Sequence, residues 1–281
     1  MKSKTPKVSV VIPCYNDKDY IEETLDAVLN QSFQDFDVII VDDGSNKETK
    51  DVLKKINHPN VSILEQKNRG LSNARNNGFK KALGIYVLTI DSDDTLDTSF
   101  LEKAVKILDE KENVSAVSSY CNIFEGNYKL ISKHLPKGGG LSDFLFDNNS
   151  TSFALIRKSS WKKIGGYDEK MINGFEDWEF WISMTKQGDY VHMIEEFLFN
   201  YRQKSISMSK ESKKNHREKN LAYIYKKHCD IYANHFTDVV DFLSELAARN
   251  KRNEIKYKTS IDFKIGKIIL FPFRTLKRMF L

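Results

Sequence analysis

The stretch VSVVIPCYND, residues 8–17, opens the ordered part of the sequence. Its first five residues are mostly β-branched and apolar, and the run stops at Pro13. Such a run is typical of a strand buried on both faces of a parallel sheet. Residues 19–31 follow with apolar side chains at helical spacing, so the sequence begins with a strand and then a helix.

The same alternation continues along the chain. Strands are predicted at 38–41, 61–64, 86–90, 114–118, 153–156, 190–194 and 197–201, and helices at 49–56, 71–83, 99–108 and 176–186. Strands and helices at this spacing predict βαβ units and an α/β fold, Rossmann-like, with a mainly parallel sheet and flanking helices. Three consecutive glycines, 138–140, predict a mobile loop. Helices at 213–230 and 236–249 predict a C-terminal helical extension.

Charge divides the 281 residues into two parts. The net charge is +5, but residues 1–202 hold 26 Lys and Arg against 31 Asp and Glu, a net −5. Residues 203–281 hold 18 against 8, a net +10. The sequence therefore predicts an acidic body and a basic tail that needs an anionic partner.

Several classes of protein are not indicated. No apolar run approaches the ~20 residues of a membrane-spanning helix, and residues 1–7 hold no apolar signal segment. Cys14, Cys121 and Cys229 are odd in number and far apart, which predicts free thiols in a reducing cytosol. Neither a P-loop nor a dinucleotide fingerprint follows the first strand. We therefore expect a cytoplasmic protein without the usual phosphate-binding loops.

Aspartates follow three of the predicted strands. The carboxyl ends of parallel strands meet at one edge of a sheet, where ligands bind. We therefore expect five carboxylates to lie close together: Asp42, Asp43, Asp91, Asp93 and Asp94. One aspartate after a strand commonly caps a helix, and this reading suits Asp42 best. The D-x-D spacing at 91–93 favours Mg²⁺ or Mn²⁺, which would neutralise the diphosphate of a nucleotide.

Other side chains near these strand ends are candidates for holding the nucleotide. Tyr15 could stack on a base, and Asp43 could accept a hydrogen bond from a base N–H. Arg69 and Arg75 could pair with phosphate or base oxygens. A structural salt bridge explains Arg75 equally well.

Five motifs in a fixed order carry a family resemblance. They are VSVVIPCYN (8–16), VDDGS (41–45), NRGLSNARN (68–76), DSDD (91–94) and EDW (176–178). Together they resemble family 2 glycosyltransferases, which have the GT-A fold, over residues 7–205. The resemblance implies inverting transfer from a nucleotide-diphosphate sugar, often a UDP-sugar, with Mg²⁺ or Mn²⁺.

The resemblance also implies roles for the residues that hold the donor. Pro13, Tyr15 and Asp17 would line the base and ribose pocket, and Asp43 would contact the uracil-like edge of the base.

The DSDD motif would bind sugar and metal. Asp91, with Ser92 beside it, would lie near the ribose and sugar. Asp93 would be the main metal ligand, with Asp91 or Asp94 sharing that role. The family often has a histidine near residues 201–204 that helps to bind metal or diphosphate. Lys204 stands in that stretch and could pair with the diphosphate, so the third protein ligand stays open.

The EDW motif would supply the residues that act on the acceptor. The resemblance places the catalytic base at Asp177 and lets Glu176 orient the acceptor. The alternative is that Asp177 caps a helix. Trp181 is expected in the core, and Trp178 is left either in the core or against a sugar ring.

The predicted organisation is a catalytic domain at 1–205, with a donor half at about 1–120 and an acceptor half at about 121–205. A basic helical extension spans 206–281. Its end, 263–281, mixes apolar and basic residues, with Pro272 predicted to split it into two pieces. Phe273, Leu276 and Phe280 share one helical face, which favours contact with an anionic membrane over packing on the catalytic domain. No nucleic-acid partner is indicated.

We therefore expect a glycosyltransferase of surface polysaccharide or glycoconjugate biosynthesis that acts on a glycan or lipid-linked acceptor. Its expected place is the inner face of the cell membrane, as a peripheral protein. A polyisoprenyl-phosphate sugar synthase and a non-catalytic nucleotide-sugar binder are the alternatives. The intact carboxylates of the DSDD and EDW motifs argue against the binder.

Overall fold

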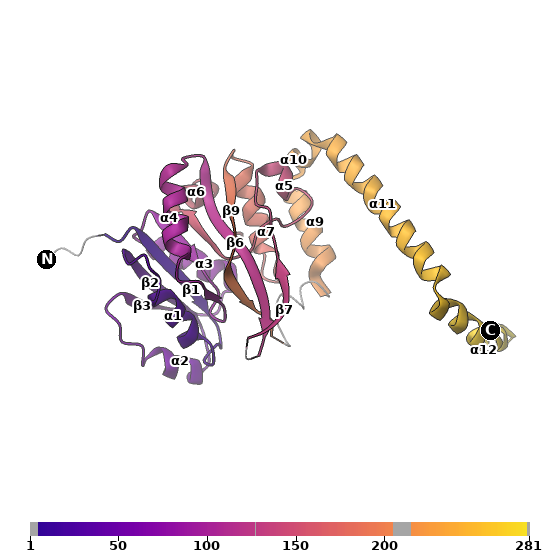
Figure 1. Cartoon of the computed structure of the whole chain (residues 1–281), viewed down its shortest axis with the longest axis horizontal. Coiled ribbons are helices and arrows are strands. Elements are labelled where there is room, and N and C mark those ends of the chain that lie inside the picture. The colour runs from indigo at the N-terminus through magenta and orange to yellow at the C-terminus, as the bar shows by residue number, and fades with distance from the viewer. Residues whose placement is uncertain (1–4, 127, 205–214, 280–281) are drawn as a thin grey trace. The chain divides into compact units, whose positions relative to one another are not determined.

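The computed structural model describes residues 5–126, 128–204 and 215–279, with side chains up to residue 271 (Figure 1). The strands are β1 (Val8–Cys14), β2 (Phe36–Asp43), β3 (Val61–Gln66), β4 (Tyr86–Thr89), β5 (Thr95–Leu96), β6 (Val114–Glu125), β7 (Lys129–His134), β8 (Ala154–Arg157) and β9 (Tyr190–Arg202). The helices of the first part are α1 (Ile21–Leu29), α2 (Lys47–Leu53), α3 (Leu71–Lys81), α4 (Phe100–Glu110), α5 (Leu141–Phe144), α6 (Lys158–Ile164), α7 (Glu176–Thr185) and α9 (Arg217–Lys227). After them come α10 (Cys229–Asn234), α11 (Phe236–Thr259) and α12 (Ile261–Met279).

The strands form one nine-stranded mixed sheet in the order β3-β2-β1-β4-β8-β6-β9-β5, with β7 paired to β6. Strands β1 to β4 run parallel, as the βαβ pattern predicts. Strand β8 runs antiparallel to both β4 and β6, so the acceptor half of the sheet is mixed. The predicted α/β fold is confirmed, and its parallel part is the half that carries the strand-end aspartates.

Strand β1 lies at the centre of the parallel half and is buried along its whole length. On one face, its side chains share a core with helices α1 and α4. On the other face it is covered by α3, which packs so closely that a Cβ on Gly78 would lie 2.3 Å from Val11. Helices therefore cover both faces, which explains why the strand is continuously apolar.

Aromatic side chains fill the layer between α3, α6 and α7. Phe79 stacks on Trp161 at 5.2 Å between ring centroids, and Tyr167 stacks on Phe180 at 4.1 Å. Trp181 is wholly buried, as predicted. Trp178 is also buried and donates its indole N–H to the carbonyl oxygen of Phe144, so it belongs to the core.

Several local predictions were wrong. Gly138 and Gly139 are buried, and Gly139 pairs with Val191, so the glycine run is fixed to the sheet and is no free loop. The two strands predicted at 190–201 form the single strand β9, and β7 was missed. Helix α12 continues through Pro272, because a proline removes one backbone hydrogen bond without necessarily ending a helix.

The chain divides into two compact units, Met1–Lys227 and His228–Leu281. No described residue of α11 is buried. None of the described helices combines the length and the apolarity that crossing a membrane requires. The side chains of Phe273, Leu276 and Phe280 lie outside the described part of the chain, so their predicted face stays untested.

Candidate active site

The polar loops after β1 and β2 are tied together at the carboxyl edge of the sheet. Asn16, with a left-handed φ of 60°, accepts a hydrogen bond from the backbone N–H of Asn46 at 2.7 Å. Its own N–H donates to Ser45 Oγ at 3.1 Å. Asp42 is buried and accepts from the N–H of Ser45 at 2.9 Å. Asp42 therefore stabilises this turn, while Asn46 caps α2.

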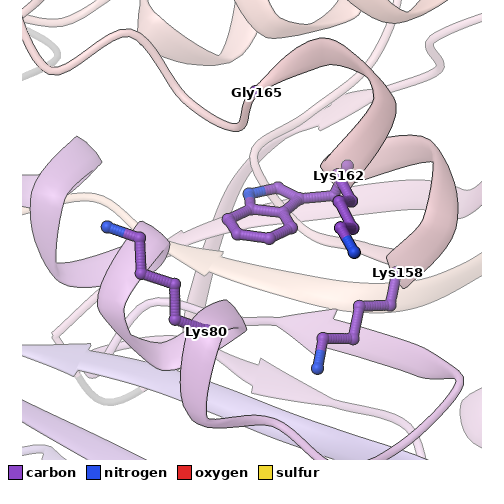
Figure 2. Close-up of a pocket in the computed structure, with 5 residues that line it drawn as sticks. Lys80, Lys158, Lys162 and Gly165 are labelled. Atoms are coloured by element: carbon purple, nitrogen blue, oxygen red, sulfur yellow. The ribbon is translucent and has the colours of Figure 1, made fainter.

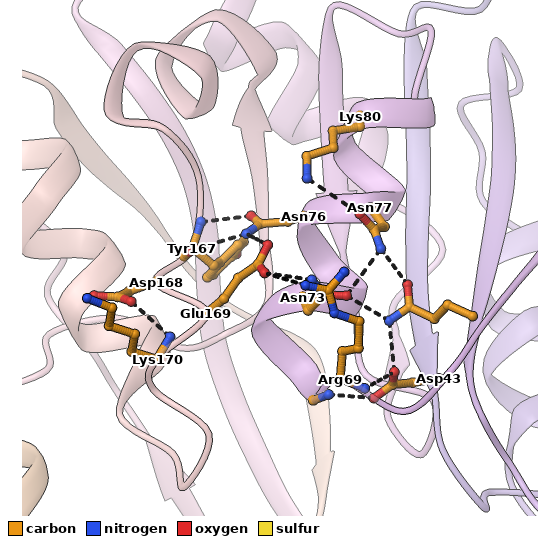
Figure 3. Close-up of polar contacts among 12 residues, drawn as sticks. Asp43, Arg69, Asn73, Asn76, Asn77, Lys80, Tyr167, Asp168, Glu169 and Lys170 are labelled. Carbon is orange, nitrogen blue, oxygen red and sulfur yellow. Dashed lines mark hydrogen bonds and ion pairs between the residues drawn. The ribbon is translucent and has the colours of Figure 1, made fainter.

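Asp43 holds the loop that leads into α3 (Figure 3). One carboxylate oxygen accepts from the N–H of Arg69 at 2.8 Å and from Gln66 Nε2 at 2.8 Å. The other accepts from the N–H of Gly70 at 2.9 Å. The predicted contact of Asp43 with a base stays a prediction, and the structure adds that this carboxylate positions the start of α3.

Asp17, Ser92, Asp93 and Lys204 form a linked group beside the strand ends. Ser92 Oγ donates to Asp17 Oδ2 at 2.6 Å. The ammonium of Lys204 pairs with Asp17 and, at 2.9 Å, with Asp93 Oδ2. Burial lowers the pKa of Lys204, but the two carboxylates outweigh that effect and raise it. The structure thus places Lys204 among the predicted donor residues.

Two residues of the predicted base pocket differ in exposure. Tyr15, two positions before Asp17, is half-exposed, so its ring is accessible to a ligand. Pro13 is buried within β1, opposite Val41 of β2. The predicted place of Pro13 in the base pocket stays a prediction, and its buried side chain is not exposed to a ligand.

Asp93 and Asp94 differ in burial and in what their oxygens contact. Burial raises the pKa of Asp93 to about 6, against the opposing effect of Lys204. Asp94 is wholly buried, and burial together with Asp93 and Asp91 raises its pKa. Its Oδ1 accepts from the N–H of Arg202 at 2.8 Å, and its Oδ2 has no donor among the described residues. Of the two, Asp93 is the carboxylate that solvent and ligands can reach.

The carboxylates fit a hard cation that takes its other ligands from the phosphates of a nucleotide. Among the residues that the structure describes, no three His, Cys, Asp or Glu side chains converge to hold a metal. Mg²⁺ sites at nucleotides commonly use one or two carboxylates plus the phosphates of the substrate. Asp93 and Asp91 are both partly exposed and offer only oxygen ligands, as such a site needs.

Arg75 connects Asp91 to helix α7. Its guanidinium is 0% exposed and donates to Asp91 Oδ1 at 2.7 Å and to Glu176 Oε1 at 2.8 Å. Glu176 is buried too; burial raises its pKa, although Arg75 opposes this. Arg75 therefore reaches the site through these carboxylates, which favours the salt-bridge interpretation. Arg69, by contrast, exposes its side chain and lies 3.8 Å from Glu169.

Asp177 lies in the first turn of α7, next to Glu176. Its Oδ2 accepts from Asn148 Nδ2 at 2.8 Å, and its Oδ1 accepts from the N–H of Trp178 at 2.8 Å. The helix begins after Phe175, whose φ of 67° is unusual for a residue with a side chain. Strained backbone of this kind is typical of functional sites. Sequence reasoning missed Asn148, for which only the polar run at 147–149 gave a signal.

Asparagines of the NRGLSNARN motif bind α3 to the segment before α7 (Figure 3). Asn76 donates to the carbonyl of Tyr167 at 2.9 Å and accepts from its N–H at 2.8 Å. Asn73 and Asn76 both donate to Glu169, at 2.6 and 3.0 Å. Burial raises the pKa of Glu169, but these two amides outweigh it and lower the pKa. These motif residues thus have a structural role.

Helix α9 follows the predicted domain boundary at residue 205, and it contacts the turn before α7. Asn220 donates to the carbonyl oxygens of Asn173 at 3.0 Å and Gly174 at 3.1 Å. Lys227 pairs with Asp168 and with buried Glu179, both at 2.7 Å. The predicted functional boundary at 205 stays a prediction, but the compact unit that holds the site extends to Lys227.

The order of strands and the flanking helices are those of the GT-A fold. The crystal structure of Staphylococcus aureus TarS in complex with UDP-GlcNAc has this fold and superposes with a TM-score of 0.60. The match covers 72% of this chain and 60% of TarS at 22% identity, so the likeness is one of fold.

Sequence comparison identifies the family. The family model described as glycosyl transferase family 2 matches residues 9–165, and the chain belongs to this family. A putative teichuronic acid biosynthesis glycosyltransferase of Bacillus subtilis is 31% identical over 74% of this chain and 84% of its own length. An uncharacterized glycosyltransferase of Methanocaldococcus jannaschii is 29% identical over 70% and 71%. The chain matches 20% of the Pasteurella multocida hyaluronan synthase, at 28% identity. The predicted enzyme class, glycosyltransferase, is thereby confirmed.

Proposed function

We propose that this glycosyltransferase moves a sugar, with inversion, from a UDP-linked donor to a hydroxyl of a glycan or lipid-linked acceptor. The observation that carries the proposal is the Arg75 bridge. It joins Asp91 of the donor motif to Glu176 of the acceptor motif through one buried guanidinium. This contact supports the proposal, because direct displacement requires that the donor and acceptor groups lie close together.

The donor half would hold the nucleotide through several side chains. Tyr15 offers an exposed ring to the base, and Arg69 offers an exposed guanidinium to phosphate oxygens. Lys204 already lies between Asp17 and Asp93, within reach of a diphosphate that binds there. Asp93 and Asp91 would hold Mg²⁺ or Mn²⁺, which when bound offsets the charge of the leaving diphosphate.

The acceptor half would supply the base. Asp177 would take the proton of the acceptor hydroxyl, while Asn148 fixes the orientation of its carboxylate. Glu176, held by Arg75, would orient the acceptor or its neighbouring groups.

The biosynthetic context of the proposal comes from relatives. The B. subtilis relative is named for teichuronic acid biosynthesis and the P. multocida relative for hyaluronan synthesis. TarS has been crystallised with UDP and with UDP-GlcNAc. These names support surface polysaccharide biosynthesis and a UDP-sugar donor. We extend the proposal to peripheral contact of the basic C-terminal segment with the inner face of the membrane.

Paired variants test the division of roles. Asp177→Asn should lower kcat by about 10²- to 10⁴-fold, the usual contribution of a general base, and leave UDP binding intact. Asp93→Ala should abolish the Mn²⁺-dependent part of UDP binding. The measurements are UDP release over a panel of UDP-sugars and calorimetric titration of UDP with and without Mn²⁺. Substantial transfer by Asp177→Asn would remove Asp177 as the base, and unchanged Mn²⁺-dependent affinity of Asp93→Ala would remove the metal assignment.

A further inference from the structure

Two aliphatic side chains are exposed at the edge of the sheet opposite the aspartates. Leu83 is 65% and Ile85 60% exposed, in the segment that joins α3 to β4. Between them Gly84 is buried, and a Cβ there would lie 2.6 Å from the backbone nitrogen of Ser9. The segment is thus pressed against the start of β1, while its two apolar side chains remain in solvent.

Lysines surround this pair. Lys80 and Lys81 end α3, and Lys158 and Lys162 lie on α6. Lys158 donates its backbone N–H to Ile85 at 3.0 Å and its ammonium to the carbonyl of Ala82, so α6 begins directly beside the exposed pair. None of the four lysines makes an ion pair with a described residue. They therefore gather positive charge on one face, in a part of the chain whose net charge is −5.

A hollow of about 450 Å³ opens between the lysines (Figure 2). Lys80, Lys158 and Lys162 line it, together with Trp161 and Gly165. Trp161 is nearly buried and stacks on Phe79, so the indole gives the hollow a rigid wall. The hollow is large enough for a phosphate group, with lysine side chains along its wall.

We propose that this face, made of Lys80, Lys81, Leu83, Ile85, Lys158 and Lys162, docks on an anionic lipid surface. Leu83 and Ile85 would enter the boundary between headgroups and acyl chains, and the lysines would meet lipid phosphates, one of them in the hollow. A second copy of the chain is a poorer partner, because a twofold contact would bring lysines against lysines. The proposal concerns the catalytic unit itself and does not depend on the C-terminal segment.

The position of this face limits which acceptors can reach the site. This conclusion rests on the proposed function. The face lies at the amino ends of β1 and β4, whereas the donor aspartates follow their carboxyl ends; Figure 1 shows α6 and α2 at opposite ends of the sheet. Strand β1 has seven residues and spans about 23 Å. With β1 upright on the lipid surface, the reactive hydroxyl would stand about 20 Å from that surface. A glycan chain reaches this far, and the phosphate of a polyisoprenyl lipid does not.

The test measures the polarity around a fluorophore attached at a single position of the full-length chain. Cys229→Ser removes the exposed thiol, since Cys14 and Cys121 are buried. Leu83→Cys on that background is labelled with an environment-sensitive fluorophore, and Leu130→Cys on β7, 53% exposed in the parent, is the matched control. Vesicles of phosphatidylglycerol should shift the emission at residue 83 to the blue and leave residue 130 unchanged. Adding Lys80→Ser and Lys162→Ser should raise the lipid concentration for half-maximal response about thirty-fold.

Three results would overturn the proposal. The first is solvent-like emission at residue 83 while the chain floats with the vesicles. The second is an equal response to phosphatidylcholine vesicles, which would remove the anionic requirement. The third is a response that depends on protein concentration without lipid, which would indicate a second copy. UDP release by the same variants with a soluble acceptor reports on the proposed function separately.

Discussion

Arg75 is the side chain through which the two halves of the site are joined. A wholly buried guanidinium is stable only when its charge is compensated, and here Asp91 and Glu176 provide this on either side. The ring of Tyr167 lies 5.4 Å from the guanidinium carbon and adds a cation–π contact. The same pairing keeps two carboxylates close together at the candidate active site, so one arginine both stabilises and orients them.

Replacing Arg75 should therefore be costly. Arg75→Met leaves two carboxylates without their counter-ion, and we expect a loss of about 3–5 kcal/mol in the free energy of unfolding. Arg69→Met is the control, because its exposed side chain should change stability by less than about 0.5 kcal/mol. Urea denaturation followed by circular dichroism measures both. Equal midpoints for the two variants would contradict the role of the bridge.

At the scale of elements, the start of α7 depends on α9. The turn before α7 has left-handed backbone at Gly174 and at Phe175. Asn220 of α9 binds the carbonyls of Asn173 and Gly174 and so satisfies backbone groups that would otherwise be left unpaired. A helix that contributes no predicted catalytic residue thus positions the turn that presents Glu176 and Asp177.

Asn220→Ala should loosen that turn. We expect the free energy of unfolding to fall by about 1–3 kcal/mol, because two carbonyl groups lose their hydrogen-bond donor. We also expect kcat to fall by a larger factor than the donor KM rises, because the donor pocket is untouched. Lys219→Ala, an exposed change on the same helix, is the control. Asn220→Gln should restore part of kcat. Indistinguishable kinetics and unfolding for the two alanine variants would rule out the positioning role.

The contact of Asp168 with α9 should make stability depend on pH. Burial raises the pKa of Asp168, but Lys227, the N–H of Lys170 and Tyr223 outweigh it and hold the pKa below its ordinary 3.8. A carboxyl with a lowered pKa stabilises the fold above its unfolded pKa and loses that effect as pH falls through the folded value. The difference in melting temperature between the parent and Asp168→Asn should therefore be full above about pH 5 and shrink progressively as the pH falls below 3.8. Melting curves at several pH values measure it, and a constant difference would exclude the charge as its cause.

For the whole molecule, charge divides the chain into an acidic part, residues 1–202, and a basic part, residues 203–281. The acidic part gathers carboxylates at strand ends, where a cation and a nucleotide would offset them. In the C-terminal unit, α12 exposes apolar side chains up to residue 271: Ile261, Ile265, Ile268, Ile269, Leu270 and Phe271. Lys264 and Lys267 lie among them. This mixture suits an interfacial helix on an anionic membrane.

Removing that helix should weaken membrane attachment. A chain that ends at Ile261 should float with phosphatidylglycerol vesicles only at much higher lipid concentration than the full chain, because stable attachment usually needs two signals. The binding of the full chain should weaken with salt, since the lysines act through screened charge. Equal flotation of the two chains at every salt concentration would defeat the membrane interpretation of the tail.

By itself, the sequence determined the α/β class, the buried strands and the order of the motifs, because each depends on residues that are neighbours along the chain. Apolar runs, helical spacing and aspartates at strand ends are all local signals. Only the tertiary structure decided which charges meet. It brings Lys204 to Asp17, 187 positions away, Asn148 to Asp177, and α9 to the turn before α7. The physical reason is that a long-range ion pair or buried hydrogen bond follows from how elements pack, and this packing leaves no periodic trace in the sequence.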